Sequence, residues 1–325
     1  MIGAELKTIY SVLLICAVSA CQQSQQESTP QNQERGQPFF WAVDWHPEKE
    51  QFAVGGSNDT LRILSAIDFE EIKSYPYAGT ITKVKWHPSQ NVLAIAVQDG
   101  KSDPCILNLN TDQQTALDSV SAEGARAIGW NHYGDLLAVA DYEGVLSLFN
   151  ETGKLLRRVN TGQKSIIDLD WHPTDNVIVG VGEGISWYDY ETDSLATIED
   201  RTEDILMLAV AWHPAGGFFV TGDYGDFQYH YSPLLQYWTA HGQLIKSIED
   251  SEAEYRNLSW SNDGERLAST IEKISLWNKD GELMAEKLSA NLLWGVDWNA
   301  NGSRLVVSDI GGELMVLDRD LELLD

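Results

Sequence analysis

The sequence predicts an all-β fold built from seven copies of one four-stranded unit. A short apolar segment that ends in Trp and precedes a polar turn recurs along the chain, at spacings of 41, 44, 41, 41, 48 and 38 residues. A period of about 40 residues is expected of four-stranded propeller blades. We call the residues that end these segments the marker tryptophans: Trp45, Trp86, Trp130, Trp171, Trp212, Trp260 and Trp298. We therefore expect a seven-bladed β-propeller over residues 39–325.

Within each repeat, the strand signals follow one order. After the marker tryptophan comes a turn rich in Pro, Asp, Asn or Gly, and then a second apolar run such as QFAVGG or VLAIAV. A third run, such as LRIL or LSLF, and a fourth follow after turns that contain Asp or Gly. Short β-branched and aromatic runs between turn residues predict strands. No long amphipathic helical stretch follows residue 21.

The marker tryptophans have a structural explanation. Stacked blades bury both faces of each sheet, and one Trp side chain offers roughly 150–250 Å² to bury. At about 25 cal/mol per Å², each contributes at most roughly 4–6 kcal/mol before chain entropy is counted. Four of them precede a histidine: His46, His87, His172 and His213. Because these histidines belong to different blades, we expect turn residues rather than a zinc site, which needs four converging ligands.

The repeats resemble those of the WD40 family, whose members form circular β-propellers. The resemblance covers roughly residues 39–325 and depends on the period, the Trp-ending strand and turn, and GSNDTLRIL at 56–64. The chain has no Gly-His and no Trp-Asp dipeptide, and Trp277-Asn278 comes nearest. The hydrogen-bonded tetrad of that family therefore cannot be assigned here. We expect blade 7 to be built from the C-terminal chain alone, with residues 321–325 as its outermost strand.

The N-terminal residues have the features of a secretory signal. One lysine lies near the start, an apolar run covers residues 9–18, and small residues precede Cys21. Such a run is too short to cross a bilayer, which needs about 20 residues. Val18-Ser19-Ala20-Cys21 resembles the bacterial lipobox, which implies cleavage of residues 1–20 and lipid on Cys21. The alternative is an ordinary secretory signal with an incidental cysteine.

Residues 21–38 are expected to tether the propeller to a membrane. The segment 22–37 is rich in Gln and lacks apolar residues, so burial cannot offset the cost of ordering it. Gln22 after the cysteine implies sorting to the outer membrane in Gram-negative lipoproteins, which places the protein in the bacterial cell envelope. Of the three cysteines, only Cys105 lies in the propeller, and we expect its thiol to be buried.

The formal charge of −27 limits the classes of partner. With 49 acidic against 22 basic residues, the chain lacks the basic balance that nucleic-acid binding requires. The same charge favours basic partners or divalent cations. We therefore expect no nucleic acid among the ligands.

The residue four positions before each marker tryptophan is the first candidate for binding. By resemblance, these residues begin the innermost strands, at the mouth of the central channel on the top face. FFWAVDW and LLWGVDW match closely, and ring closure makes their blades neighbours, so Trp41 and Trp294 should pair, with Arg126 and Arg256 in the same ring. Trp and Arg dominate interface hot spots. The alternative is packing between blades. The full set is Trp41, Thr82, Arg126, Ile167, Leu208, Arg256 and Trp294.

Two further features should lie on the top face. An insertion at 222–238 in blade 5 is unusually aromatic for a loop, which suits a partner-binding surface, although a small hairpin folded onto its own blade would also explain it. An acid ends nearly every second strand, as turn chemistry favours, although an acidic rim for calcium or a basic peptide is the alternative. The loop residues are Tyr224, Phe227, Tyr229, His230 and Tyr231, and the acids are Asp59, Asp99, Asp141, Glu183, Asp223, Glu272 and Asp309.

The sequence contains no catalytic signature of the kinds G-x-x-x-x-G-K-[ST], H-E-x-x-H, C-x-x-C or G-x-S-x-G. We therefore expect a membrane-tethered scaffold that binds a protein or peptide on its top face, without catalysis and without a cofactor. Calcium binding is an alternative that the sequence leaves open. One alternative is a propeller hydrolase with a carboxylate-held metal in the channel, which needs several acids close to one point. The other is a lectin-like carbohydrate binder that uses Trp41, Trp294 and the aromatic loop as stacking platforms.

Overall fold

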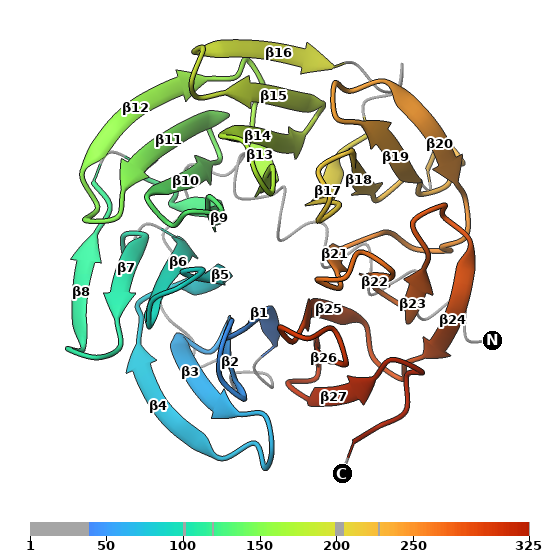
Figure 1. Cartoon of the computed structure of the whole chain (residues 1–325), viewed down its shortest axis with the longest axis horizontal. Helices are drawn as coiled ribbons and strands as arrows, with labels where there is room; N and C mark the ends of the chain where they lie inside the picture. The colour runs from blue at the N-terminus through green and yellow to red at the C-terminus, as the bar shows by residue number, and fades with distance from the viewer. Residues whose placement is uncertain (1–38, 100–101, 119, 199–204, 227, 325) are drawn as a thin grey trace, which may run out of the picture. The chain divides into compact units, whose positions relative to one another are not determined.

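The computed structural model describes residues 39–99, 102–118, 120–198, 205–226 and 228–324. Throughout this part of the chain the regular secondary structure is β, and seven antiparallel sheets stand radially around one axis (Figure 1). The predicted all-β, seven-bladed propeller is confirmed. The expected signal peptide (1–20) and the tether (21–38), with Cys21, lie outside the described residues.

The first four blades each contain four strands. Blade 1 consists of β1 (Phe40–Trp45), β2 (Gln51–Gly56), β3 (Thr60–Ser65) and β4 (Glu71–Pro76). Blade 2 consists of β5 (Thr80–Trp86), β6 (Val92–Gln98), β7 (Cys105–Asn108) and β8 (Gln113–Ala116). Blade 3 consists of β9 (Ala125–Trp130), β10 (Leu136–Asp141), β11 (Val145–Asn150) and β12 (Leu155–Asn160). Blade 4 consists of β13 (Ile166–Trp171), β14 (Val177–Gly182), β15 (Ile185–Asp189) and β16 (Ser194–Ile198).

The last three blades complete the ring. Blade 5 consists of β17 (Met207–Trp212), β18 (Phe218–Asp223), β19 (Leu235–Thr239) and β20 (Leu244–Ile248). Blade 6 consists of β21 (Asn257–Trp260), β22 (Leu267–Thr270), β23 (Lys273–Trp277) and β24 (Leu283–Leu288). Blade 7 consists of β25 (Leu293–Trp298), β26 (Arg304–Asp309) and β27 (Leu314–Asp318).

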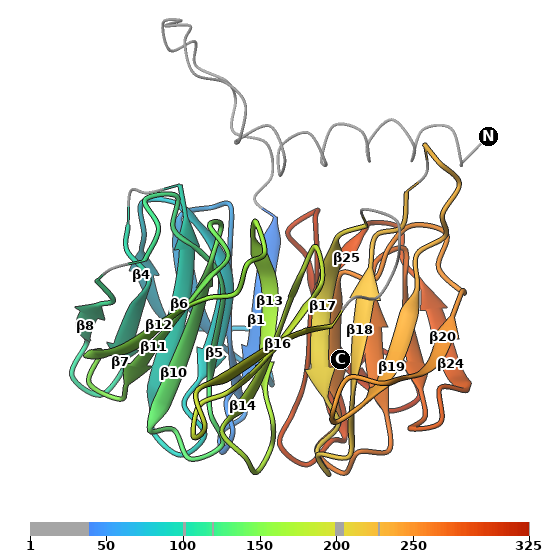
Figure 2. The same cartoon turned by 90° about the horizontal axis from the view of Figure 1, so that it is seen from above.

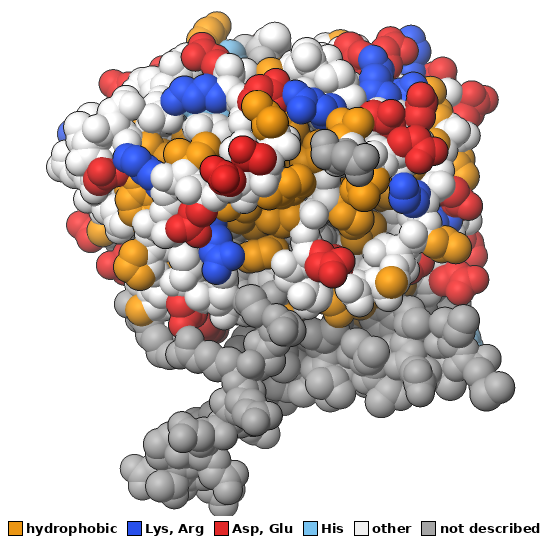
Figure 3. Space-filling view, turned by 90° about the horizontal axis from the view of Figure 1, so that it is seen from below, with side chains coloured by type: hydrophobic (Ala, Val, Ile, Leu, Met, Phe, Trp, Pro, Cys, Tyr) orange, Lys and Arg blue, Asp and Glu red, His pale blue; other side chains and the backbone are white. Residues whose placement is uncertain are grey.

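Taken over the blades, burial is greatest in the second strands and least in the outermost strands. The second strands are buried almost throughout, because each lies between two neighbouring sheets, whereas the outermost strands are largely exposed. The turns gather at two opposite faces (Figure 2). We call the face where the first strands begin the top face and the other the bottom face. On the side that Figure 3 shows, acidic and basic side chains are interspersed around an apolar area.

The hydrophobic core lies between blades rather than within one blade. Seven buried clusters occur, and each combines side chains from two neighbouring blades. All seven marker tryptophans are at most 8% exposed. The indole Nε1 of Trp171 donates to the carbonyl of Gly129 in the preceding blade at 2.8 Å, and Trp86 donates in the same way to Asp44 at 3.1 Å. The predicted role of these residues between successive sheets is confirmed.

The histidines after the marker tryptophans join the bottom-face turns of neighbouring blades. In each ring, Nδ1 accepts a hydrogen bond from a backbone N–H of its own turn. In three of them, Nε2 bonds at 3.0 Å to a glycine carbonyl in the next blade's turn: His87, His172 and His213. The rings lie 4.5–5.0 Å from the marker tryptophan of the next blade. Their expected role in the scaffold is confirmed.

The ring closes by contact between blades 7 and 1. The backbone N–H of Trp45 donates to the carboxylate of Asp297 at 2.8 Å, and the hydroxyl of Ser308 donates to the carbonyl of Phe40 at 3.0 Å. Among the described residues, blade 7 is built from the C-terminal segment 293–318 alone, as expected. The expected outermost strand at 321–325 is reduced to a single bridge between Leu317 and Leu323. A tight turn precedes it, with Leu321 at a φ of +62°, and this turn leaves only a short segment aligned with β27.

Cys105 lies inside blade 2, and its side chain is 3% exposed. The hydroxyl of Tyr77 lies 3.3 Å from its Sγ atom. Burial raises the pKa of the Cys105 thiol to about 11. The expected buried thiol is confirmed.

Candidate functional site

A repeated β-bulge creates the channel mouth. In six of the seven first strands, the pairing with the second strand shifts at the position four residues before the marker tryptophan. A bulge leaves its extra residue unpaired and turns its side chain away from the regular alternation. One cavity on the axis is consequently lined by all seven of these residues, together with three from the next position: Trp41, Thr82, Lys83, Arg126, Ile167, Asp168, Leu208, Arg256, Asn257 and Trp294. We call this cavity the channel mouth.

Two tryptophans and two arginines pack together at the seam between blades 7 and 1. The rings of Trp41 and Trp294 meet edge to face, with centroids 4.6 Å apart and planes at 81°. The guanidinium of Arg126 lies 4.9 Å from the ring of Trp41, and that of Arg256 lies 4.9 Å from the ring of Trp294. The predicted aromatic pair and its arginines are thus in contact. Trp294 is only 4% exposed, so packing between blades, the alternative interpretation, also describes this residue.

The charges at the channel mouth are only partly paired. Lys83 forms an ion pair with Asp168 at 2.8 Å, across the channel from blade 2 to blade 4. Arg256 donates through Nε and Nη2 to Glu254, at 2.8 and 2.5 Å. Among the described residues, the guanidinium of Arg126 has no hydrogen bond or ion pair at contact distance; it lies over the ring of Trp41 and interacts at longer range with Asp168 and Glu254. Burial and the positive charge of Arg256 lower the pKa of Arg126, while the nearby carboxylates of Asp168 and Glu254 act in the opposite direction.

A second charged layer lies deeper in the channel. The carboxylate of Asp44 accepts from Lys85 at 2.5 Å and from the backbone N–H of Trp86 at 2.6 Å. Asp170 accepts from the backbone N–H of Trp212 at 2.7 Å. These carboxylates tie the first strand of one blade to that of the next, as Asp297 does at the closing seam. Burial raises the pKa values of Asp44 and Asp170 to about 6 each.

Sequence reasoning missed these polar residues of the channel. Lys83 and Asp168 stand three positions before their marker tryptophans, and Asp44, Asp170 and Asp297 stand one position before theirs. Residues at these two positions share a face with the channel because side chains alternate along a strand. An acid immediately before the tryptophan, as in AVDW, DLDW and GVDW, was the available signal.

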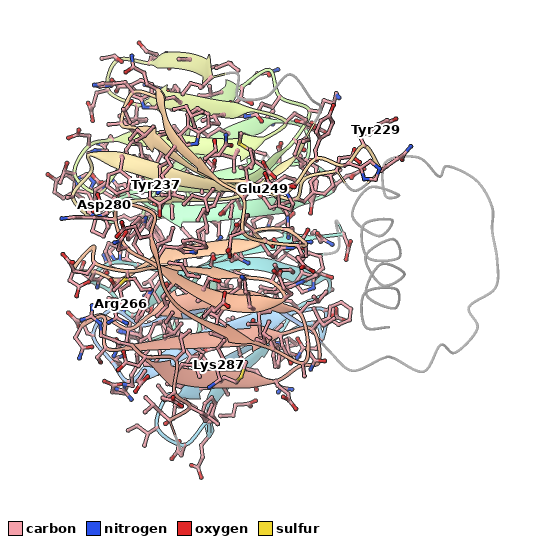
Figure 4. All side chains as sticks on the ribbon, turned by 90° about the vertical axis from the view of Figure 1, so that its right-hand side faces the viewer. Tyr229, Tyr237, Glu249, Arg266, Asp280 and Lys287 are labelled. Atoms are coloured by element: carbon pink, nitrogen blue, oxygen red, sulfur yellow. The ribbon has the colours of Figure 1, made fainter. Side chains whose placement is uncertain are left out.

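The insertion in blade 5 contains a small hairpin, the element that one of the two interpretations expected to fold onto its own blade. Asp226 and Tyr231 exchange backbone hydrogen bonds of 2.8 and 2.9 Å, and His230 has a φ of +63°. Tyr229 is 65% exposed and Tyr231 is 38% exposed. Tyr229 projects beyond the end of the sheets at the top face (Figure 4). Tyr224 is partly buried, and Phe227 lies outside the described residues.

The acids that end the second strands serve mainly in turns. Asp141 accepts from the backbone N–H groups of Glu143 and Val145 at 2.9 and 3.0 Å. Asp309 accepts from that of Glu313 at 2.7 Å. Asp223 accepts from Gly225 in its own turn, and Asp99 has a positive φ, whereas Glu183 and Glu272 accept from the loops at Lys164 and Ser251. Asp59 adopts a φ of +53°. These observations agree with the turn interpretation of the acidic rim.

In the part of the chain that the structure describes, no three His, Cys, Asp or Glu side chains form a group that could hold a metal ion. Within the same residues, no helix is long and apolar enough to cross a membrane. The chain matches no known family model, and no curated protein sequence matches it significantly. The top face is therefore where the molecule offers evidence of a function.

Proposed function

We propose that the protein is a membrane-tethered scaffold of the WD40-like type that holds a protein or peptide partner on the top face of its propeller. The observation that carries this proposal is the channel mouth, to which all seven blades contribute side chains. It combines two tryptophans and two arginines, which are the residue types that dominate interface hot spots. Because the strands are committed to packing between blades, binding falls to the loops and the mouth.

The hairpin of blade 5 adds a second contact area on the same face. Tyr229 and Tyr231 are exposed there, and tyrosine suits surfaces that must be both apolar and able to form hydrogen bonds. We therefore propose that the partner contacts both the mouth and this hairpin. The net charge of −27 favours a protein or peptide over nucleic acid.

The geometry of the indoles favours the scaffold over the lectin-like alternative. A sugar stacks on an open aromatic face, but a guanidinium lies over each ring, and the two rings contact each other. The hydrolase alternative would need several acids converging on one point, whereas the rim acids Asp141, Asp223 and Asp309 bond to their own turns. The proposal assigns no enzymatic activity and no cofactor.

The membrane tether is a separate part of the proposal. The lipobox-like segment 18–21 supports lipidation of Cys21 and placement at the outer membrane of a bacterial envelope. Fractionation of cells that express Cys21→Ala tests it: the variant should leave the membrane fraction. Retention of the variant in that fraction would contradict a lipid anchor.

Site-specific photo-crosslinking in the cell envelope tests the binding function. A benzoylphenylalanine introduced at Tyr229 reports on the top face. The same residue at Tyr133 is the matched control, because Tyr133 is 69% exposed in the bottom-face turn between β9 and β10 and Tyr229 is 65% exposed. We expect position 229 to capture a specific protein that position 133 does not, as identified by mass spectrometry. Identical captures at both positions, or none at 229, would refute the proposed scaffold.

A further inference from the structure

We infer that the channel mouth binds a single carboxylate group of the partner, held by the guanidinium of Arg126. This inference rests on the proposed function, since it names the chemistry that the same face recognises. The carboxylate belongs either to a peptide C-terminus or to an Asp or Glu side chain, and the experiment below separates these two sources.

The first argument is the state of the three cations at the mouth. Lys83 is paired with Asp168, and Arg256 is paired with Glu254. Within the described part of the chain, Arg126 alone among the three lacks an anionic partner. A partly buried charge without a partner is costly, and a carboxylate would supply one. A ligand with one carboxylate would give this guanidinium the hydrogen-bonded anion that Asp168 gives to Lys83 and Glu254 gives to Arg256.

The second argument is the orientation of Arg126. Its guanidinium lies over the ring of Trp41 at 4.9 Å, an arrangement that favours the cation by attraction to the aromatic face. A guanidinium presents its donors in a planar fork that matches a carboxylate in a bidentate geometry. The stacked arrangement therefore restricts the side chain before a ligand arrives, which reduces the entropy lost on binding.

The third argument is the size and polarity of the cavity. About 20 Å³ is free for the centres of water molecules, and one water needs about 10–15 Å³ of such space. That room suits the end of a carboxylate-bearing chain. Apolar side chains of Ile167, Leu208 and Trp41 contribute to the walls, and an ionic hydrogen bond is stronger where water is scarce.

Fluorine NMR on the full-length chain labelled with 5-fluorotryptophan tests this inference without knowledge of the partner. The resonances of Trp41 and Trp294 are assigned by replacing each residue with Phe. The probes are N-acetylglycine for a C-terminal carboxylate, N-acetylaspartate α-amide for a side-chain carboxylate, and neutral N-acetylglycinamide. We expect saturable shifts of these two resonances with a carboxylate probe, in the millimolar range for so small a ligand, and none with the neutral amide. The carboxylate probe that binds more tightly identifies the source.

Two substitutions of Arg126 and one control define the site. Arg126→Gln should weaken carboxylate binding about ten-fold or more, the loss expected of a charged hydrogen bond. Arg126→Lys, which keeps the charge without the fork, should weaken it less. Arg62→Gln should leave binding unchanged, because Arg62 lies on β3 and pairs with Glu71 at 3.6 Å. Melting temperatures establish that each variant is folded. If Arg126→Gln does not fold, the carboxylate affinity of folded Arg126→Lys tests the inference in its place.

Three results would overturn the inference. They are equal shifts with the neutral amide, unchanged affinity in both folded Arg126 variants, and tighter binding of inorganic phosphate than of either carboxylate. Photo-crosslinking from position 229 in the Arg126→Gln variant tests the proposed scaffold separately from the carboxylate site. If carboxylates do not bind but the specific capture persists, the scaffold stands and the carboxylate site falls. If carboxylates bind but nothing is captured, the carboxylate site stands and the scaffold falls.

Discussion

Replacing marker tryptophans by phenylalanine would measure what the indole hydrogen bonds contribute to the ring. Trp171 and Trp212 make a matched pair, because each is 5% exposed at the end of a first strand. They differ in one respect. The Nε1 of Trp171 donates to the carbonyl of Gly129 at 2.8 Å, whereas that of Trp212 has no hydrogen-bond partner among the described residues.

Both substitutions remove similar ring area, so their common cost should cancel in the comparison. Trp171→Phe additionally loses a hydrogen bond with a net contribution of about 0.5–1.5 kcal/mol, whereas Trp212→Phe removes a buried N–H group that has no partner and so relieves part of its own cost. We expect Trp171→Phe to lower the free energy of unfolding by about 1–2 kcal/mol more than Trp212→Phe.

Urea denaturation followed by far-UV circular dichroism is the suitable assay, because the fluorescence signal itself changes with the substitutions. The comparison holds if the two variants show the same denaturant dependence. Equal destabilisation, or a larger loss for Trp212→Phe, would refute the assignment of stability to the interblade hydrogen bond of Trp171.

Three further predictions concern the bottom face, the channel and the lone thiol. Gly134→Ala should destabilise the protein by about 2 kcal/mol or more, because the new Cβ would lie 2.2 Å from Nε2 of His87. Gly162→Ala is the control, since Gly162 also has a positive φ but a Cβ there would meet nothing within 4 Å, and it should cost only about 1 kcal/mol. Thermal unfolding of the two variants measures the difference. Burial lowers the pKa of His87, so the unfolded chain takes up protons first and stability falls as the pH drops through about 6.5. Asp170, with its pKa raised to about 6, opposes that fall because the folded state takes up its proton first, so Asp170→Asn should steepen the loss of stability between about pH 7 and 5 in denaturation curves. Cys105, 3% exposed, should react with a thiol reagent only after unfolding, and rapid labelling of the folded chain would contradict its burial.

The fold could be predicted from the sequence because every blade packs between its neighbours in the same way, so the same residue pattern recurs in each repeat. The spacing of the marker tryptophans gave the number of blades, and their burial between sheets agrees with it. The residue four positions before each marker tryptophan could also be identified from the sequence. Its position is found by counting back from the tryptophan, and that count does not require knowledge of the bulge. That count placed Trp41 beside Trp294 and put Arg126 and Arg256 in the same ring.

The charge pairing inside the channel could not be predicted in the same way. Lys83 reaches Asp168 two blades away, and this choice depends on the channel's width and on which neighbouring positions carry small side chains. Whether Arg126 has a partner depends likewise on every side chain within reach. The repeat pattern also could not predict the outermost strand of blade 7, because the turn that contains Leu321 limits how much of the chain aligns with β27.

The contact between Trp41 and Trp294 has a consequence for when the protein first becomes competent to bind. One indole belongs to the first repeat to leave the ribosome and the other to the last, so the cavity they line does not exist until synthesis of the array is finished. A nascent or truncated chain would offer its partner no such pocket. Under the proposed function, recognition at this seam would also report that all seven blades have been made and folded.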